Sequence, residues 1–507
     1  MNEKVNEIKY PIGVQNFAEI RERGFLYIDK TAYIHLLIKG KYYFLSRPRR
    51  FGKSLLLSTI ESYYQGRRDL FKGLALNSLT EDWEPHPVLH LDLNSGSYMN
   101  TDGLEEILND HISEWEKRYN LRIPGEEIKE SVSSRFRKVI KAASETTGKK
   151  VVILIDEYDK PLLNTIGNEE LAEKFRDTLK SVYSNLKSMD NFIELAFLTG
   201  VARFSKVSIF SDLNNLRDIS FEEEFAGICG ITSEELDSYF QEGIKQLSEK
   251  EGTSAEEIRE SLRRNYDGYH FANISPDIYN PFSLMNVFAK LRLGAYWFES
   301  GTPTYLVKLI EREQWMLKDI APFEIDANTL ESAGVLSSDP IPVLYQTGYL
   351  TIKDYDRDFN TYTLDYPNQE VRDGFLSFLI PYYIKPEGQP SRFSLKKFVL
   401  SLNSGDVEGF MELLQSMLAD IPYSEKGSAE AHFQNASYIL FSLMGQYVGI
   451  EDRTSDGRID LTVETSKYIY IFEFKINSTA EEALKQIHEK EYWLKFLPSE
   501  KEIYLIG

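Results

Sequence analysis

Short apolar runs alternate with helical patterns over the first third of the chain. Four runs rich in β-branched and aromatic residues indicate buried strands: YYFLS (42–46), PVLHLDL (87–93), VVILI (151–155) and FIELAFL (192–198). Between the last two, apolar residues recur at steps of three and four from Leu171 to Leu186, which is typical of an amphipathic helix. Strands separated by helices predict a parallel, doubly wound α/β sheet with its ligand site at the carboxyl ends of the strands.

A helical pattern dominates from about residue 231 to 390. Thr232 precedes Glu235 in ITSEELDSYF, which predicts a capping box at the start of a helix. Pieces with Pro and Gly, such as YNPFS (279–283) and SGTPTYL (300–306), interrupt the pattern. We expect a helical, winged-helix-like middle region, with a linker in KPEGQPSRFS (385–394).

The last part of the chain returns to a mixed α/β pattern. The expected elements are helices at 395–402, 406–418 and 429–446, strands in GRIDLTV and YIYIFEFK, a helix from Thr479 and a last strand EIYLIG. Because the chain stops at that strand, we expect a final element to be truncated or missing. Three domains are therefore expected, at 1–230, 231–390 and 391–507.

Composition narrows the class of protein. The 507 residues are 42% hydrophobic and 13% aromatic, as in a folded globular protein. A net charge of −21 disfavours broad attraction to nucleic acid or anionic membranes but leaves room for a local basic groove. The single cysteine, Cys229, excludes an internal disulfide, and with seven scattered histidines it argues against structural zinc. With neither a signal-peptide core nor a run near the ~18 apolar residues of a membrane span, we expect a cytoplasmic protein without a membrane partner.

The segment LSRPRRFGKS (45–54) matches a phosphate-binding loop at its end but not at its start. The usual pattern is G-x-x-x-x-G-K-[ST]; Gly52, Lys53 and Ser54 fit it, whereas Arg47 stands at the first glycine. A predicted strand precedes the loop and a predicted helix follows it, as the motif requires. Gly52 then allows close approach of phosphates, Lys53 contacts the outer phosphates and Ser54 holds Mg²⁺. On the loop alone, a chance match in a basic turn is equally consistent.

The segment VVILIDEYDKP supplies the other half of a nucleotide site. Its apolar run ends in Asp156 and Glu157. Asp156 is placed to bind Mg²⁺ through its water shell, and Glu157 to polarise the attacking water. Acidic residues also end strands without such a role, but both halves on one predicted sheet favour a site for ATP and Mg²⁺.

A third strand end, LTGVARFSK, offers two more candidates. Thr199 is placed to sense the γ-phosphate from a neighbouring strand, and Arg203 to complement charge in the transition state. A surface role for Arg203 is an equal alternative. A homo-oligomer in which Arg203 reaches a neighbour's nucleotide is a third arrangement that the sequence leaves open.

Six segments together resemble the predicted AAA-ATPase-like proteins. They are YPIGVQNFAEIRERGFLYIDKTAYIHLLI, SRPRRFGKSLLLSTIESYYQG, ILIDEYDKPL, FLTGVARFSKVSIFSDLNNL, NYDGYHF and IYNPFSLMNVF, which span residues 10 to about 310. That family has RPRRFGKS in the loop itself, so Arg47 is the family's own variant. The resemblance implies a P-loop ATPase core related to the signal-transduction ATPases.

The resemblance also extends the candidate nucleotide site. Beside Gly52, Lys53 and Ser54, the implied binding segment includes Arg47, Arg49, Arg50, Phe51 and Leu55. By the same analogy, residues near the adenine are Tyr10, Pro11, Ile12, Tyr27, Asp29 and Lys30, although by themselves Tyr10 and Tyr27 fit ordinary core aromatics. Arg47 lacks glycine's freedom at positive φ, so the start of the loop should differ from the usual turn. The three loop arginines either bind the nucleotide or face outward, toward a partner.

The segment GRIDLTVETSKYIYIFEFK is predicted to form a hairpin with ETSK as its turn. If Val463 faces Tyr468, then Asp460 pairs with Ile471 and shares a face with Glu473 and Lys475, because strand side chains alternate. Two carboxylates can hold Mg²⁺, and a nearby lysine can orient or activate water against a phosphodiester. Further candidates for this site are Glu430, on a preceding helix, and Gln486, on a following one.

This arrangement resembles the PD-(D/E)xK nuclease superfamily over about residues 395–507. The resemblance implies an α/β restriction-endonuclease-like domain that acts on DNA or RNA. Ile459 stands where many members have proline before the aspartate. Members can lose activity while keeping the carboxylates, and a hairpin face with paired charges is the alternative, so nuclease activity itself stays open.

One basic helix raises a separate question. The segment 131–150 carries six basic residues and one acidic residue, and its apolar face runs from Val132 through Phe136 to Ala143. A solvated helix face is favoured over a nucleic-acid contact.

The sequence thus predicts an ATP-binding, ATP-hydrolysing protein whose nucleotide state controls a nuclease-like domain. The alternative is a non-cleaving, ATP-dependent switch or scaffold. It would bind nucleic acid or a protein partner through an inactive nuclease fold, and the acidic net charge mildly favours it.

Overall fold

The computed structural model divides the chain into two compact units. It describes residues 8–94, 96, 98, 100–121, 130–165, 167–203, 215–299, 306–307, 309–310, 315–332, 339–383, 394–419, 429–445, 449–451, 461–475 and 478–507. The first unit comprises Met1–Gly301 and Ala321–Val371, and the second comprises Thr302–Ile320 and Arg372–Gly507. Domain boundaries at 230 and 390 stay a prediction, and the expected linker falls mostly outside the described residues.

A five-stranded parallel sheet forms the centre of the first unit. Its strands are β1 (Tyr42–Ser46), β2 (Val88–Asp92), β3 (Val151–Asp156), β4 (Ile193–Gly200) and β5 (Arg217–Asp218), in the order β2-β3-β4-β1-β5. The predicted parallel sheet is confirmed, and the four apolar runs are its first four strands. Because β4 lies between β1 and β3, the ends of these three strands meet at one edge.

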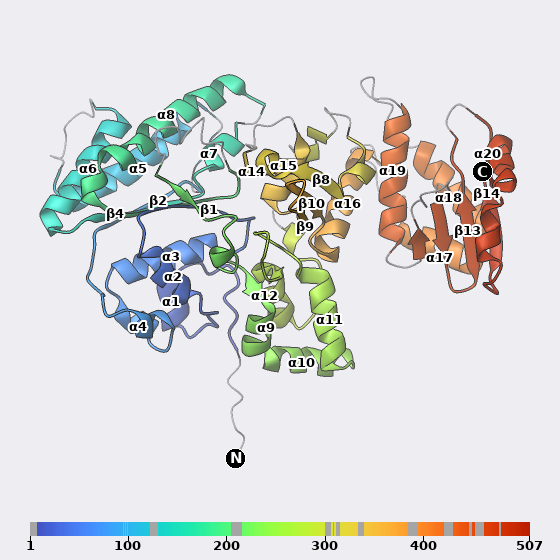
Figure 1. Ribbon diagram of the computed structural model, residues 1–507, viewed down its shortest axis with the longest axis horizontal. Coiled ribbons are helices and arrows are strands. Elements are labelled where there is room, and N and C mark those ends of the chain that lie inside the picture. Colours follow the sequence, from blue (N-terminus) through green and yellow to red (C-terminus); the bar gives the residue numbers. More distant parts are fainter. Residues whose placement is uncertain are drawn as a thin grey trace, which may run out of the picture. The chain divides into compact units, whose positions relative to one another are not determined.

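Helices cover both faces of this sheet (Figure 1). One face carries α1 (Phe17–Glu22), α2 (Thr31–Leu37), α3 (Lys53–Tyr64) and α4 (Leu76–Leu79), and the other carries α5 (Gly103–Arg118), α6 (Val132–Thr147) and α8 (Glu169–Ser188). The short α7 (Lys160–Leu163) follows β3. The apolar face predicted from Leu171 to Leu186 is the buried face of α8. It packs in the hydrophobic core that α8 shares with the sheet.

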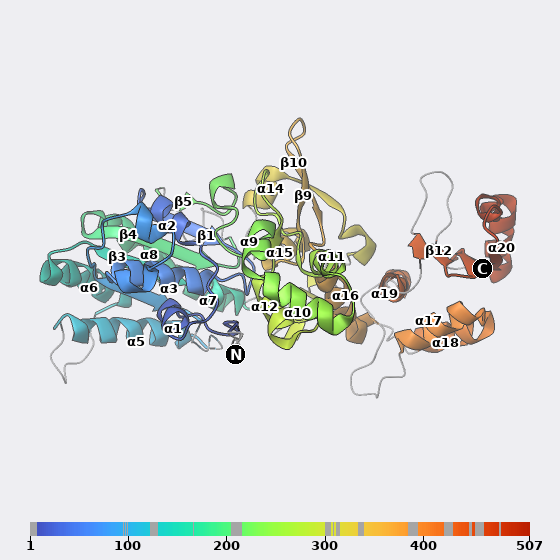
Figure 2. The same cartoon turned by 90° about the horizontal axis from the view of Figure 1, so that it is seen from below.

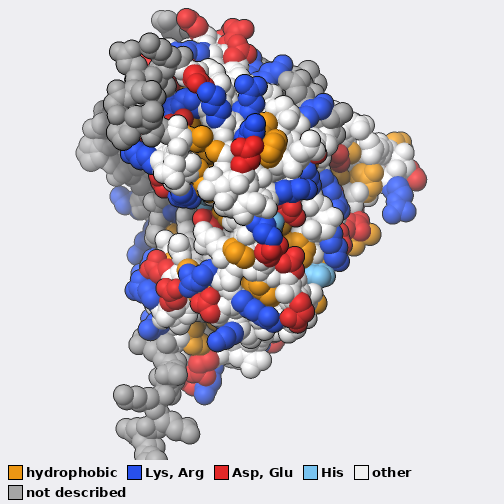
Figure 3. Space-filling model, turned by 90° about the vertical axis from the view of Figure 1, so that its left-hand side faces the viewer, with side chains coloured by type: hydrophobic (Ala, Val, Ile, Leu, Met, Phe, Trp, Pro, Cys, Tyr) orange, Lys and Arg blue, Asp and Glu red, His pale blue; other side chains and the backbone are white. Residues whose placement is uncertain are grey.

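The basic helix α6 is tied to the protein's own acidic residues. Arg135 is buried and forms a two-point ion pair with Glu116 on α5, with Nε–Oε1 and Nη2–Oε2 distances of 2.9 and 2.7 Å. On the exposed side, Lys138 pairs with Glu130. On the face of the molecule in Figure 3, basic and acidic side chains are interspersed, without a broad basic field. This arrangement fits a solvated helix face.

The ion pair between Arg135 and Glu116 gives a stability prediction. Their side chains are only 5% and 11% exposed, so Glu116→Ala leaves a buried guanidinium without its charged partner. We expect a loss of about 3–5 kcal/mol in the free energy of unfolding, measured by denaturant titration. The matched control is Glu114→Ala, which removes the exposed partner of Arg118 one turn away and should cost at most about 1 kcal/mol. Equal losses in the two variants would contradict the prediction.

Four helices follow the parallel sheet in the first unit. They are α9 (Ser233–Tyr239), α10 (Gln241–Glu251), α11 (Ala255–Tyr266) and α12 (Pro281–Lys290), with β6 (Ile231–Thr232) and β7 (Ile278–Tyr279) paired antiparallel beside them. The predicted capping box is confirmed: Thr232 and Glu235 exchange side chain-to-backbone hydrogen bonds at the start of α9.

The winged-helix-like middle region stays a prediction, and residues 323–365 within it hold two helices and a three-stranded sheet. The elements are β8 (Phe323–Asp326), α14 (Ala327–Ser332), α15 (Pro340–Thr347), β9 (Thr351–Asp356) and β10 (Thr361–Asp365), with strand order β8-β10-β9. The β9–β10 hairpin projects from the unit (Figure 2). Most of α15, by contrast, is buried within the unit.

The second unit has a four-stranded sheet with helices. Its elements are α17 (Leu395–Ser404), α18 (Val407–Ala419), α19 (Ala429–Met444), α20 (Ala480–Glu489), β11 (Gly449–Glu451), β12 (Leu461–Glu464), β13 (Tyr468–Phe472) and β14 (Glu502–Ile506). The strand order is β11-β12-β13-β14, and β13 runs parallel to β14. The long α16 (Gln369–Tyr383) begins in the first unit and continues into the second.

The predicted register of the β12–β13 hairpin was wrong. Val463 pairs with Tyr470, not with Tyr468. The reason is a tighter turn: the Thr465 hydroxyl accepts the N–H groups of Lys467 and Tyr468, and Thr465 N–H donates to the Tyr468 carbonyl. The shift from position 468 to 470 is even, so it does not change which side chains share a face.

Short 3₁₀ helices complete the described chain, at Arg68–Phe71, Asp190–Phe192, Glu223–Phe225, Trp297–Glu299, Leu317–Asp319 and Tyr492–Phe496. None of the described helices combines the length and the apolar character needed to cross a membrane.

Candidate functional site

The loop between β1 and α3 has the backbone of an anion-binding turn. Gly52 has a φ of 92°, in the left-handed region that favours glycine, and it stands at the N-cap of the twelve-residue helix α3. A Cβ on Gly52 would meet no atom of the described residues within 4 Å, so there is open space beside this glycine. Within the described residues, no side chain caps this end of α3. Its backbone N–H groups and positive dipole end therefore suit a phosphate.

The side chain of Lys53 folds back onto the predicted phosphate-binding loop. This side chain is buried, and Nζ donates to the carbonyls of Arg47 and Pro48 at 3.0 and 3.2 Å. The same Nζ is 3.6 Å from Oε1 of Glu157. Ser54 and Leu55 follow in the first turn of α3, where both are half-buried.

The acidic residues lie at the carboxyl end of β3, next to the end of β4. Asp156 is buried, and its Oδ1 accepts a hydrogen bond of 2.7 Å from the Thr199 hydroxyl. Glu157 has a φ of 53°, an uncommon backbone conformation for a residue with a side chain, and its carboxylate approaches Lys53. The structure thus brings Lys53, Asp156, Glu157 and Thr199 to one edge of the sheet. The donor set fits a nucleotide with Mg²⁺, because it combines a cation, an open helix terminus and two carboxylates.

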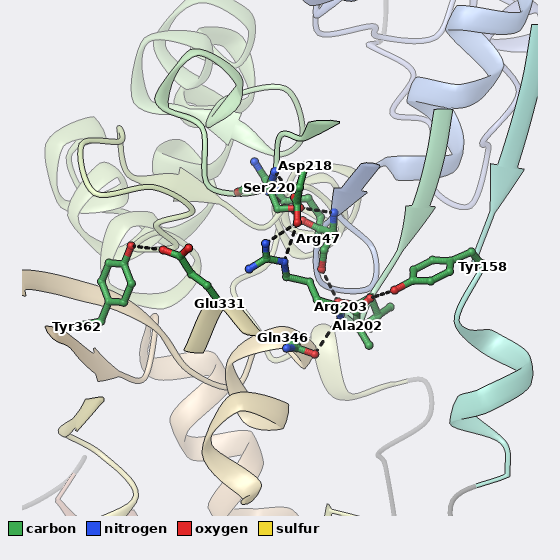
Figure 4. Close-up of polar contacts among 11 residues, drawn as sticks. Arg47, Tyr158, Ala202, Arg203, Asp218, Ser220, Glu331, Gln346 and Tyr362 are labelled. Carbon is green, nitrogen blue, oxygen red and sulfur yellow. Dashed lines mark hydrogen bonds and ion pairs between the residues drawn. The ribbon is translucent and has the colours of Figure 1, made fainter. Parts of the chain in front are cut away.

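Two neighbours of Glu157, missed from the sequence, hold the end of β4. Asp159 is buried, and its Oδ2 accepts the N–H groups of Val201 and Ala202 at 3.0 and 2.6 Å. The Tyr158 hydroxyl donates to the Ala202 carbonyl at 2.7 Å (Figure 4). Burial and the nearby Glu157 raise the pKa of Asp159. The signal in the sequence was the third acidic residue of DEYD, Asp159.

Arg203 is engaged with protein groups in this structure. Its Nε lies 2.9 Å from Oδ2 of Asp218 on β5, and its guanidinium lies 4.6 Å from the centre of the Phe221 ring. Its backbone N–H donates to Oε1 of Gln346 on α15 at 3.1 Å (Figure 4). Arg203, three residues after the end of β4, therefore links the parallel sheet to α15.

The loop arginines have three different environments. Arg47 does not face outward, contrary to one sequence-based alternative: it is 1% exposed and donates to the carbonyls of Ser46, Ser220 and Phe225. Arg49 is exposed. Arg50 is half-buried, and its guanidinium lies over the ring of Phe282 in the middle region. Phe51 is buried and makes edge contacts with the rings of Tyr269 and Phe271.

The residues that the resemblance places near adenine are largely in contact with other protein groups. Tyr10 stacks on Phe240 and Phe288, with both centroid distances 6.0 Å. Asp29 accepts hydrogen bonds from Thr31 and from the Ala75 N–H, and Lys30 pairs with Glu235 at 2.7 Å. Tyr27 is buried, Pro11 is half-buried and Ile12 is exposed.

The second unit brings together three of its five predicted residues. Lys475 Nζ lies 2.8 Å from Oε1 of Glu473 and 2.6 Å from Oε1 of Gln486, whose amide nitrogen also donates to Glu473. Glu473 is 2% exposed, and its backbone N–H donates to Ile506 on β14. Asp460 lies outside the described residues, and so does the side chain of Glu430 on α19. Within the described part of the chain, no group of three or more His, Cys, Asp or Glu side chains gathers as a metal site.

These features define a P-loop protein of the ATPase class with a nuclease-like C-terminal domain, and comparisons agree. Residues 11–210 match the family model of the predicted AAA-ATPases, and residues 428–507 match that of the PD-(D/E)XK nuclease superfamily. An uncharacterized protein in the vnfD 5′ region of Azotobacter chroococcum mcd 1 is 35% identical over 520 residues, which cover 98% of this chain and 96% of that protein. The chain belongs to the predicted AAA-ATPase family.

Proposed function

We propose that this protein binds ATP with Mg²⁺ at the β1–α3 loop and hydrolyses it. The nucleotide state then controls a C-terminal nuclease-like domain that acts on nucleic acid. The observation that supports this most is the convergence of Lys53, Asp156 and Glu157 beside the open N-terminus of α3. This set is what phosphoryl transfer needs, since catalysis there is mainly positioning and charge stabilisation.

Each residue has a distinct proposed role. Lys53 exchanges its loop carbonyls for the outer phosphates, and Ser54 with Asp156 would hold Mg²⁺, which supplies charge neutralisation when bound. Glu157 orients and polarises the attacking water. Thr199, hydrogen-bonded to Asp156, senses the γ-phosphate from β4. For Arg203 to complement transition-state charge, its ion pair with Asp218 must open.

Lys53→Ala tests the nucleotide site. Charge-assisted hydrogen bonds are worth about 2–3 kcal/mol, so we expect ATP affinity to fall roughly 30- to 150-fold, measured by isothermal titration calorimetry. The control is Lys72→Ala, which removes an exposed lysine of the same unit and should leave affinity unchanged. Equal affinity of Lys53→Ala and the wild-type protein would refute the proposed site.

A non-cleaving module is the second candidate function. The net charge of −21 mildly favours it, because acidic side chains repel a phosphate backbone. In this alternative, the nuclease-like domain binds nucleic acid or a protein without cutting.

The remaining proposals concern the setting of the protein. We propose that the protein is cytoplasmic and that the second unit binds DNA or RNA. We also propose a homo-oligomer in which Arg203 reaches the nucleotide of a neighbouring subunit. Size-exclusion chromatography with light scattering, with and without ATP, tests the oligomer.

A further inference from the structure

We propose that Arg50 of the phosphate-binding loop is a positioning residue that reports nucleotide occupancy to the connections between the two units. These connections are the segments at Tyr296–Trp297 and at the start of α16, from which the chain passes into the second unit. The inference rests on the proposed binding of ATP at the same loop. It names the route by which that binding would reach the nuclease-like domain.

Arg50 links the loop to the helical region by two kinds of contact. Its guanidinium carbon lies 3.6 Å from the centre of the Phe282 ring at the start of α12, a cation–π geometry. Its Nη1 donates to the carbonyls of Tyr296 and Trp297 at 3.2 and 3.5 Å. Arg50 also has a φ of 69°, so the loop holds this side chain in an uncommon backbone conformation.

The same segment is held from its other side by Glu370. Oε1 of this buried carboxylate accepts the N–H groups of Tyr296 and Trp297 at 2.5 and 3.0 Å. Its Oε2 accepts the Ser283 hydroxyl at 2.8 Å. Arg50 therefore binds the carbonyls of a segment whose amides are bound by Glu370. A shift of the arginine would be felt by both the segment and α16, because buried networks of this kind are rigid.

Both bound segments lie where the chain leaves the first unit. Trp297 opens the 3₁₀ helix Trp297–Glu299, and the first unit ends at Gly301, four residues after Trp297. Glu370 lies in the first turn of α16, and the first unit ends again at Val371, the next residue. Movement of Arg50 would thus shift the segment Tyr296–Trp297 and, through Glu370, the start of α16. From each of these two places the chain passes into the second unit.

Phosphate binding is expected to change the conformation of the loop, because it competes for the hydrogen bonds of Lys53. Lys53 follows Arg50 in the loop and donates to the carbonyls of Arg47 and Pro48, which precede Arg50. When Lys53 turns to a phosphate, these bonds are exchanged and the loop between positions 47 and 53 is reshaped. The side chains of Arg47 and Phe51 are held in buried contacts, whereas Arg50 is half-buried, so Arg50 is the arginine placed to follow the change.

Hydrogen–deuterium exchange of the full-length protein, with and without the ATP analogue AMP-PNP and Mg²⁺, tests this role. In the wild-type protein we expect the analogue to slow exchange in α3, in 296–299 and in 369–383. In Arg50→Ala we expect the effect to persist in α3 and to be lost in the other two segments. Arg50→Lys should recover part of it, since an ammonium can still donate to the Tyr296 carbonyl. The matched control is Arg264→Ala, an exposed arginine on α11, which should behave as the wild-type protein does.

Two results would overturn the proposal. One is an undiminished nucleotide effect at 296–299 and 369–383 in Arg50→Ala. The other is exchange at 296–299 that is already unprotected in this variant without nucleotide, as expected of a purely structural contact. If Arg50→Ala does not fold, Phe282→Leu removes the stacking partner from the other side and carries the same expectation. Absence of AMP-PNP binding to the wild-type protein in calorimetry would instead refute the proposed ATP site, so the two failures are distinguishable.

Discussion

Glu157→Gln is expected to lower ATP turnover by roughly 10²–10⁴-fold while ATP binding is retained. Glutamine keeps the size and polarity of the side chain but cannot accept the proton of an attacking water. The residue sits at the end of β3 with its carboxylate 3.6 Å from Lys53, so the change does not disturb the apolar core. Turnover is measured as phosphate release at saturating ATP, and binding by calorimetry. Loss of a negative charge beside Lys53 should leave affinity equal or slightly higher.

The control for this variant is Glu173→Gln, an exposed glutamate on α8, which should hydrolyse ATP at the wild-type rate. If Glu157→Gln also keeps the wild-type rate, Glu157 is not the group that activates water. If the wild-type protein binds ATP but does not turn it over, the nucleotide serves as a structural ligand or slow switch, as in the non-cleaving alternative.

The parallel sheet could be predicted from the sequence because its signal is local. Strands buried on both faces are near-continuous apolar runs, and VVILI fills β3 with fully buried side chains. Where such an apolar run stops in the sequence, the strand ends, so the residues that follow the run lie at the carboxyl edge of the sheet. Lys53, Asp156 and Thr199 could therefore be assigned to one edge of the sheet from the sequence alone.

The directions of the loop arginines could not be predicted, because their partners are distant in the chain. Arg47 donates to Ser220 and Phe225, and Arg50 to Tyr296. No periodicity links position 47 with 220, so only the folded packing decides between phosphate, solvent and these carbonyls. The side chain–backbone bonds of Asp159 were missed for the same reason.

The hairpin in the second unit was misaligned for a different, local reason. A four-residue turn ETSK and a tighter turn closed by Thr465 and Tyr468 are both compatible with the apolar alternation. Turn chemistry decides the register, and the capping preference of the Thr465 hydroxyl was the missing observation.

Lys475→Ala is expected to reduce metal-dependent cleavage of nucleic acid by roughly 10²–10³-fold, the usual cost of removing one charge-stabilising donor from an active site. Its Nζ is held between Oε1 of Glu473 and Oε1 of Gln486, at 2.8 and 2.6 Å. The lysine is therefore oriented by its neighbours, as a group that acts on a phosphodiester or its attacking water must be. Cleavage is followed on plasmid and single-stranded DNA, and on RNA, with Mg²⁺ or Mn²⁺.

Lys485→Ala is the matched control for Lys475→Ala, because it removes an exposed lysine from α20, one residue before Gln486. It should cleave at the wild-type rate. Cleavage by Lys475→Ala at that same rate would assign the activity elsewhere. Binding of DNA or RNA by the wild-type protein, without cleavage under any of these conditions, would favour the non-cleaving module. The cluster of Glu473, Lys475 and Gln486 would then be a retained structural feature, since a buried carboxylate needs its cation whether or not it catalyses.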